Sequence, residues 1–217
     1  HIARQVVNAL RELKEVKEIN PAGSLRRMKE TIGDIDILVI SSNPEKVMDT
    51  FTSLPLVGEI RAKGATKSSI ITRDGIQVDV RVVEPISYGA ALAYFTGSKA
   101  HNIRVREMAV KGKLKISEYG VFDERTGKRK AGRKEEEIYQ AVGLPWIPPE
   151  LREDTGEIEA ALEGRLPQLI EAGDIKGDLH VHSDWSDGAH SIEELIGEAK
   201  KRGYSYIAVT DHSQGLG

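Results

Sequence analysis

The sequence predicts an α+β fold, a mixed sheet with helices that is followed by a βαβ unit. Residues 35–40 and 76–83 are β-branched, apolar runs, which is typical of largely buried strands. Over residues 2–19 apolar side chains recur at spacings of three and four, which predicts an amphipathic helix. The order strand, helix, strand over residues 178–210 is typical of one βαβ unit.

Turn and capping residues delimit the other elements. Between residues 20 and 83 we expect a Pro-Ala-Gly-Ser turn that caps a short helix over 25–29, a helix over 43–51, and strands over 68–72 and 76–83 joined by a hairpin at Asp74-Gly75. Beyond them we expect helices over 87–95 and 98–111, a hairpin with a basic tip over 113–130, a helix over 135–142, and βαβ elements over 179–182, 191–202 and 206–210. Ser191 and Glu194 have the spacing of a capping box at the last helix.

Charge is distributed unevenly along the chain. The net charge is −3, but residues 99–134 carry 12 basic and 4 acidic side chains, whereas residues 135–217 carry 6 basic and 18 acidic ones. A basic stretch of this kind indicates a surface for a polyanion such as nucleic acid. An ordinary solvated surface is the alternative that charge alone leaves open.

Composition excludes several classes of protein. The chain has no cysteine, which excludes disulfides and thiolate metal sites. Its longest uncharged run, residues 85–98, is shorter than the ~20 apolar residues that a membrane-spanning helix needs, and no signal peptide precedes it. We therefore expect a cytoplasmic protein. Because the chain starts at His1 and ends just after a histidine motif, we also expect a piece of a longer protein.

Three aspartates are expected on one face of the sheet. Asp34 and Asp36 are two residues apart on a predicted strand, so both point to the same face. Asp79 lies on another predicted strand and joins them if the two strands are neighbours. Adjacent carboxylates repel, and a divalent cation relieves the repulsion. Three of them can hold two Mg²⁺ ions, typically ~3.5–4 Å apart, for phosphoryl transfer. Alone, an Asp-x-Asp pair is more often a turn or strand edge.

A turn that favours phosphate precedes the paired aspartates. Gly23 lets the backbone approach a ligand, and free N–H groups at the helix that starts beside Ser24 favour an anion. Arg26 or Arg27 adds positive charge. The ordered run of glycine-serine, spacer and paired aspartates resembles the signature of nucleotidyltransferases, which implies Mg²⁺ or Mn²⁺ at the carboxylates.

Further segments narrow the resemblance to one family. Residues 78–81 read Val-Asp-Val-Arg, residues 94–98 read Tyr-Phe-Thr-Gly-Ser, and Asn102 and Arg106 follow on one helix face. Over residues 1–145 this order is similar to the X family of DNA polymerases, the polymerase-beta-like enzymes. The resemblance implies DNA-directed addition of deoxynucleotides to a primer 3′-hydroxyl by two-metal-ion nucleotidyl transfer, in gap filling during DNA repair.

The resemblance also implies a role for each matching residue. The implied metal ligands are Asp34, Asp36 and Asp79, and Asp79 would also accept the proton of the primer hydroxyl. The implied nucleotide-binding residues are Gly23, Ser24 and Arg27 at the triphosphate, Arg81 as an arginine that changes partners on closure, Tyr94, Phe95 and Gly97 against the deoxyribose, Asn102 at the incoming base and Arg106 at the template side. His101 stands where the family has an aromatic residue.

A second constellation lies near the C-terminal end. His180 and His182 share one face of a predicted strand, Asp187 follows in a loop, and His212 ends the next strand. These ligand types suit zinc, manganese or iron. Residues 174–217 resemble the start of a PHP domain, which implies Zn²⁺ or Mn²⁺ and 3′–5′ exonuclease or phosphoesterase chemistry. Because the later ligands of that domain are absent here, we expect this part to be inactive by itself.

The expected organisation has four parts: a nucleotidyltransferase palm over residues 1–85, a thumb over 86–147, a linker over 148–173 and the first part of a PHP domain over 174–217. The implied partners are primer–template or gapped DNA and deoxynucleoside triphosphates, with no membrane, and the implied state is a monomer. Two alternatives stay open: a nucleotidyltransferase acting on RNA ends or small molecules, and a DNA-binding module without catalysis.

Overall fold

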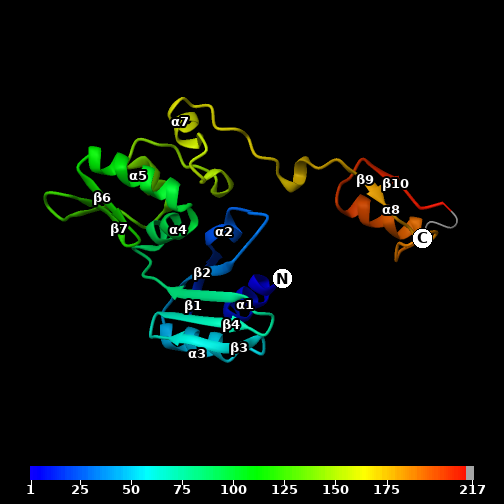
Figure 1. Cartoon of the computed structure of the whole chain (residues 1–217), viewed down its shortest axis with the longest axis horizontal. Helices are drawn as coiled ribbons and strands as arrows, with labels where there is room; N and C mark the ends of the chain where they lie inside the picture. Colours follow the sequence, from blue (N-terminus) through cyan, green and yellow to red (C-terminus); the bar gives the residue numbers. More distant parts are fainter. Residues whose placement is uncertain (214–217) are drawn as a thin grey trace. The chain divides into compact units, whose positions relative to one another are not determined.

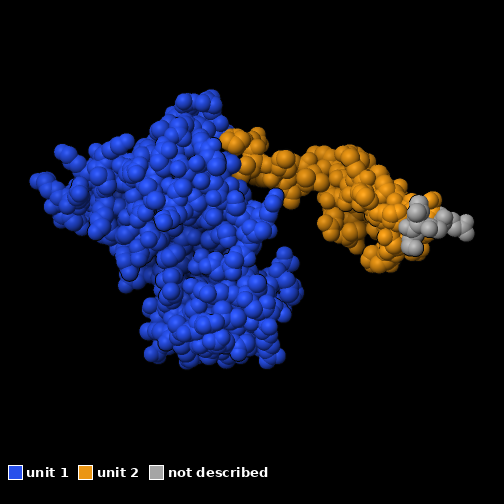
Figure 2. All heavy atoms as spheres, viewed as in Figure 1, with its two compact units in different colours: residues 1–166 blue, residues 167–217 orange. Residues whose placement is uncertain are grey.

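The computed structural model describes residues 1–213 of the chain. The chain divides into two compact units, the first over residues 1–166 and the second starting at Pro167 (Figure 2). None of the helices in the described residues has both the length and the apolar run that crossing a lipid bilayer requires. The predicted α+β class is confirmed, because each unit combines strands with helices.

A five-stranded mixed sheet forms one part of the first unit (Figure 1). The strands are β1 (Val16–Pro21), β2 (Asp34–Ser41), β3 (Val57–Lys63), β4 (Lys67–Thr72) and β5 (Gln77–Val82), in the spatial order β1-β2-β5-β4-β3. β2 and β5 run parallel, and the other neighbouring pairs are antiparallel. The two strands that carry the predicted aspartates therefore lie side by side in the middle of the sheet.

Helices cover both faces of this sheet. On one face α1 (Ile2–Arg11) and α3 (Pro44–Thr52) pack against the apolar side chains of β2 and β5, with Ile37 and Val80 fully buried. On the other face α4 (Tyr88–Thr96) packs against Leu38 of β2. Because side chains alternate along a strand, Asp34 and Asp36 lie on the same face as Leu38, which is the face that α4 partly covers.

The rest of the first unit is a smaller region with its own core. Its elements are α4, α5 (Lys99–Lys111), β6 (Leu114–Ser117), β7 (Gly120–Asp123), β8 (Arg129–Ala131), α6 (Glu135–Gln140), the 3₁₀ turn η1 (Pro149–Leu151) and α7 (Glu157–Leu162). The Ser98 side chain accepts a hydrogen bond from the His101 N–H (3.1 Å) and so caps α5, as its position in the sequence predicts. Buried Val105, Val121, Ile138 and Ile158 join these elements in one core.

The structure corrects three expectations about the elements. The helix expected over residues 2–19 ends at Arg11, and residues 16–21 form β1 because β-branched Val16 and Ile19 pair with β2 instead. β3 was not expected, since its side chains are mostly exposed and its sequence does not alternate. Residues 149–162, expected within a linker, fold as η1 and α7, with Ile158 buried in the core of α5 and α6.

The second unit contains the expected βαβ arrangement. Its elements are the 3₁₀ turn η2 (Ala172–Asp174), β9 (Gly177–Val181), α8 (Ile192–Lys201) and β10 (Tyr206–Val209), with β9 and β10 parallel. The predicted capping box is confirmed, since Ser191 accepts from the Glu194 N–H and Glu194 accepts from the Ser191 N–H. In the described part of this unit Ser183 is the one buried side chain.

Candidate functional site

The three predicted carboxylates come together on the sheet. Asp36 and Asp79 are direct partners in the register of the parallel pair β2 and β5, and Asp34 lies two residues away on the same face. Burial, together with the charges of Asp34 and Asp79, raises the pKa of Asp36 to about 6. A carboxylate with this environment is stabilised by added positive charge, so the cluster suits a divalent cation.

Two uncharged side chains hold the Asp79 carboxylate in place. The Ser69 hydroxyl donates a short hydrogen bond to Asp79 Oδ1, and Gln77 Nε2 donates to the same oxygen (3.2 Å). The other oxygen, Oδ2, lies 4.0 Å from the Lys67 ammonium. These contacts fix one oxygen of Asp79 and leave Oδ2 for a ligand. Sequence reasoning missed Ser69 and Gln77.

The Gly23 turn lies directly against the aspartates. Gly23 has a φ of +61°, and a Cβ atom at this position would stand 2.8 Å from Asp36 Oδ2. The backbone N–H of Ala22 donates to the Asp36 carbonyl (2.8 Å), which ties the turn to β2. The left-handed backbone angle favours glycine here, and a side chain at this position would also displace the Asp36 carboxylate. Ser24 follows Gly23 on the short helix α2 (Gly23–Arg26).

The two arginines of the turn have different surroundings. Arg26 makes a two-pronged ion pair with Glu135 (2.7 and 2.9 Å) and donates to the Thr96 hydroxyl (2.8 Å). Arg27 donates through Nε to Glu153 (2.7 Å) and through Nη1 to the Thr96 carbonyl (2.8 Å). Both arginines therefore connect α2 to residue 96, at the end of α4.

Glu135 is the centre of a buried charge network that the sequence did not reveal. Besides Arg26 it contacts the fully buried Arg152 and accepts from the Trp146 indole N–H (2.9 Å). Burial alone would raise the pKa of Glu135, but hydrogen bonds from Arg26 and Arg152 lower it to about 2. The carboxylate is thus ionised at neutral pH and holds α2, α6 and η1 together.

Arg81 and the two aromatic residues after it form a second part of the site. The Arg81 guanidinium lies over the Phe95 ring, 4.6 Å from its centroid, and the Tyr94 and Phe95 rings meet edge to face at 5.1 Å. Arg81 and Phe95 line a pocket of about 330 Å³ together with Lys67 and Tyr119. The structure therefore brings residues of β5 and α4 together.

Gly97 and Asn102 lie in direct contact. The Asn102 amide donates to the carbonyls of Tyr94 (2.7 Å) and Gly97 (3.0 Å), and a Cβ on Gly97 would stand 2.5 Å from Asn102 Oδ1. Arg106, one turn further along α5, is exposed and donates to the Asn102 carbonyl (3.2 Å). Asn102 thus holds the end of α4 against α5 through its Nδ2 group. Its Oδ1 atom takes no part in the bonds to Tyr94 and Gly97.

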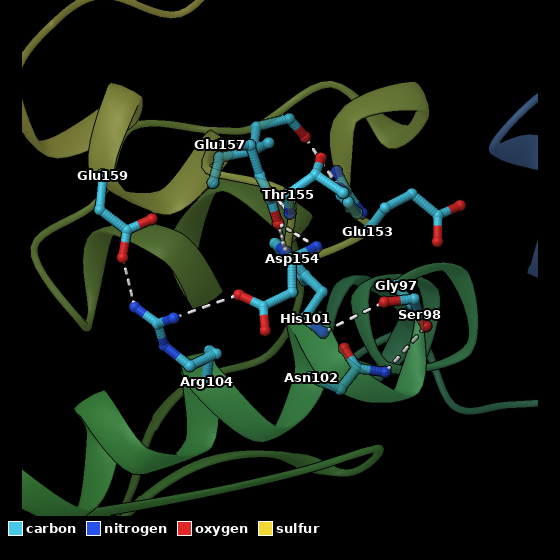
Figure 3. Close-up of polar contacts among 12 residues, drawn as sticks. Gly97, Ser98, His101, Asn102, Arg104, Glu153, Asp154, Thr155, Glu157 and Glu159 are labelled. Carbon is cyan, nitrogen blue, oxygen red and sulfur yellow. Dashed lines mark hydrogen bonds and ion pairs between the residues drawn. The ribbon is translucent and has the colours of Figure 1, made fainter.

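His101 is a core residue. It is buried, and its Nδ1 lies 2.6 Å from Glu157 (Figure 3). Its Nε2 lies 3.1 Å from the Tyr139 hydroxyl. Burial lowers the pKa of the imidazole in spite of the nearby carboxylate. A neutral ring that donates to Glu157 and accepts from Tyr139 fits both contacts. His101 therefore joins α5 to α6 and α7 where an aromatic ring was expected.

The second unit brings three of its four predicted ligands together. Ligand atoms of His182, Asp187 and His212 all lie within 4.8 Å of one another, which fits a metal ion. His180 contacts this group through His182, with 2.8 Å between their Nε2 atoms. Asp211, which sequence reasoning missed, accepts from the Ser183 N–H (2.6 Å) and so fixes the loop that carries Asp187.

Family models match three parts of the chain. They are the DNA polymerase beta palm over residues 1–79, the DNA polymerase beta thumb over residues 91–153 and the PHP domain over residues 178–217. The carboxylate cluster lies in the first match, Glu135 and Asn102 lie in the second, and the histidine group lies in the third.

Curated relatives point in the same direction. The DNA polymerase/3′–5′ exonuclease PolX of Bacillus subtilis is 43% identical over 99% of this chain, and the chain spans 38% of that protein. Rat DNA polymerase lambda is 26% identical over 60% of this chain and 28% of its own length. A repair DNA polymerase X of African swine fever virus is 24% identical over 69% of this chain and 95% of its own length.

The three matches follow one another in the same chain, and the Bacillus relative matches across all of them. The order agrees with the geometry, since the carboxylates, the Gly23 turn and the aromatic pair all lie in the first unit. The chain belongs to the X family of DNA polymerases, among the members that join a palm and thumb to a PHP domain.

Proposed function

We propose that this chain carries the nucleotidyl-transfer centre of a DNA-directed DNA polymerase that fills short gaps during DNA repair. The observation that carries the proposal is the position of Asp36 and Asp79 in register on adjacent parallel strands, with Gly23 packed against Asp36. The names of the relatives, which are DNA polymerases and repair polymerases, support the same activity. Its substrates are gapped or primer–template DNA and deoxynucleoside triphosphates.

The polymerase and PHP families use divalent metal ions, and the donor sets here fit them. We propose that Asp34, Asp36 and Asp79 hold Mg²⁺ or Mn²⁺, because three acidic oxygens in one place match the ligands that these ions prefer. When bound, such ions neutralise charge on the triphosphate and lower the pKa of an attacking hydroxyl.

Side chains near the carboxylate cluster accept the proton of the primer and bind the triphosphate. Asp79, with Oδ1 fixed by Ser69 and Gln77, presents Oδ2 as acceptor for the proton of the primer 3′-hydroxyl. Ser24 and Arg27 bind the triphosphate beside the Gly23 turn. Such fixed donors and acceptors stabilise the transferring phosphoryl group by position and charge.

The other predicted residues keep the roles that the family resemblance implies. Tyr94, Phe95 and Gly97 lie against the deoxyribose of the incoming nucleotide. Asn102 contacts its base, and Arg106 contacts the template strand. Arg81 is the arginine that changes partners on closure. Asn102 supports this assignment because it fixes the Gly97 backbone. Basic Lys111, Lys113 and Lys115 supply salt-sensitive contacts with the DNA backbone.

In the second unit we propose that His180, His182, Asp187 and His212 contribute to a Zn²⁺ or Mn²⁺ centre of a 3′–5′ exonuclease or phosphoesterase domain.

The proposed domain bounds are a palm over 1–85, a thumb over 86–147, a connecting segment over 148–173 and the PHP part from 174. The first part of the connecting segment packs on the thumb through α7. We further propose a monomer that acts in the cytoplasm.

The test is single-nucleotide incorporation on a duplex with a one-nucleotide gap. Each deoxynucleotide is supplied separately, with Mg²⁺ and then with Mn²⁺, and an Asp79→Asn variant is assayed in parallel. We expect incorporation of the nucleotide complementary to the template and its loss in the variant. Incorporation that ignores the template would instead favour a transferase for other acceptors, and equal incorporation by the variant would exclude Asp79 from the reaction.

A further inference from the structure

Glu153 is an acidic side chain inside a site that is proposed to bind a polyanion. Its Oε1 accepts from Arg27 Nε (2.7 Å) and lies 3.6 Å from the Lys29 ammonium. Arg27 and Glu153 are both largely shielded from solvent, with 13% and 21% of their side chains exposed. A carboxylate at this position either competes with the triphosphate for Arg27 or holds Arg27 ready for it.

The backbone that carries Glu153 is firmly held. The Ser98 N–H donates to the Arg152 carbonyl (3.0 Å), just before Glu153. Just after it, the N–H groups of Asp154 and Thr155 both donate to Glu157 (2.8 Å each). The backbone at Glu153 is therefore held in place, so its carboxylate reaches Arg27 from a fixed starting point.

Side-chain contacts also attach the segment that follows Glu153 to α5. Arg104 pairs with Asp154 (3.3 Å) and with Glu159, while Glu157 contacts buried His101 (Figure 3). Figure 3 shows Glu153 pointing away from the Arg104 cluster. Glu153, the last residue of the thumb match, therefore makes its ion pair with Arg27 at the end of α2, whose turn packs against the carboxylate cluster.

The contacts of Arg27 decide between competition and positioning. Its guanidinium donates through Nε to Glu153 and through Nη1 to the carbonyl of buried Thr96. Within residues 1–213, Nη2 has no protein acceptor. Two fixed acceptors orient a planar guanidinium, and the free nitrogen is then presented to an external anion. A competing carboxylate would occupy that nitrogen as well.

We propose that Glu153 is a positioning residue that holds Arg27 so that its Nη2 edge faces the triphosphate of the incoming nucleotide. The proposal rests on the proposed function, since it assigns the neighbour of a triphosphate-binding arginine. Orientation that is set in advance reduces the entropy lost on binding. Glu153 therefore contributes to nucleotide affinity in spite of its negative charge.

The test compares Glu153→Ala with Glu153→Gln in the gap-filling assay. We expect Glu153→Ala to raise the KM for the deoxynucleotide roughly five- to tenfold with a smaller change in kcat, since a charge-assisted contact is lost. Glu153→Gln should recover most of the affinity because its amide oxygen still accepts from Arg27 Nε. A KM that falls in both variants would overturn the proposal and identify Glu153 as a competitor.

A second readout separates this inference from the polymerase activity. Binding of inorganic triphosphate to the full chain, followed by ³¹P NMR at low ionic strength without divalent cations, should weaken in Glu153→Ala and recover in Glu153→Gln. Glu159→Ala is the matched control, because it removes an acidic residue of the same segment that pairs with Arg104 alone. Unchanged binding in Glu153→Ala sinks the inference, whether or not the chain incorporates nucleotides.

Discussion

At the scale of single residues, the sequence predicted the carboxylate cluster well. Strand alternation placed Asp34 and Asp36 on one face, and the parallel neighbour β5 adds Asp79. Ser69 could also have been found from the predicted hairpin. Its strands meet at Thr72 and Ile76, and the residues three positions further along each strand, Ser69 and Asp79, are therefore partners. Glu153 could not, since its partner Arg27 lies far away in the sequence and meets it only through packing.

Asp36 should limit the stability of the metal-free protein. Its raised pKa means that the folded state binds a proton more tightly than the unfolded chain between pH 3.8 and about 6, so stability falls as the pH rises through this window. In chelator at pH 7, Asp36→Asn should therefore raise the free energy of unfolding by about 1–2 kcal/mol, after allowance for partial exposure, and abolish incorporation.

Thermal unfolding at pH 7 and pH 4 checks this prediction. The stabilising effect of Asp36→Asn should shrink at pH 4, where the aspartate of the folded protein is largely protonated. A variant that is less stable than the parent at pH 7 would contradict the electrostatic account.

The Gly23 turn allows a prediction with a matched control. Gly23→Ala has to adopt a left-handed φ and also places a methyl group 2.8 Å from Asp36 Oδ2. Gly127 has a similar φ of +68°, and no atom lies within 4 Å of the position of its Cβ. Gly127→Ala should therefore lose only the stability that the left-handed backbone costs an alanine, about 1 kcal/mol. We expect gap filling to fall at least tenfold in Gly23→Ala and to stay within twofold in Gly127→Ala, measured as kcat/KM. Equal activity of the two variants would show that the contact with Asp36 is unimportant.

At the scale of elements, local signals predicted more than long-range ones. Caps at Ser98 and Ser191 and the hairpin at residues 74–75 set the bounds of their elements, because each acts within a few residues. β1 was predicted as helix because its strand conformation depends on pairing with β2, which no local pattern encodes. The packing of α6 was likewise not predictable, because it depends on the long-range contacts of Glu135 with Arg26 and Arg152.

Removing the Glu135 carboxylate should loosen the packing of these elements. Glu135→Ala leaves fully buried Arg152 without its counter-charge, and we expect the free energy of unfolding to drop by about 3–5 kcal/mol. Exposed Glu136 on the same helix is the control, and its alanine variant should stay within about 0.5 kcal/mol of the parent. Urea unfolding followed by circular dichroism measures both.

The pH dependence gives that network a second check. With a pKa lowered to about 2, Glu135 stabilises the fold above the ordinary carboxyl value of 4.5, and this contribution is lost as the pH falls from there towards 2. The stability difference between the parent and Glu135→Ala should narrow over that window. A constant difference would mean that packing, and not charge, is what Glu135 supplies.

At the scale of the whole molecule, the two candidate metal sites lie in different compact units. The carboxylate cluster uses residues of the first unit alone, and the histidine group uses residues of the second alone. Sequence reasoning located both, since metal-ligating residue types at short spacing are local signals. The connection was harder to predict, because α7 packs on the thumb through Ile158 although its surroundings are acidic and resemble a linker.

Since neither centre uses residues of the other unit, their functions should separate. In the full chain, a double variant His182→Ala with His212→Ala should bind less Zn²⁺ or Mn²⁺, measured by metal analysis after dialysis, because two of the three grouped ligands are gone. Gap filling should stay within about twofold, as the carboxylates and the Gly23 turn are untouched. His190→Ala controls for the loss of an imidazole, since His190 is exposed and lies outside the group. A loss of gap filling in the double variant alone, with the first unit still folded by circular dichroism, would show that the proposed polymerase site depends on His182 and His212 of the second unit.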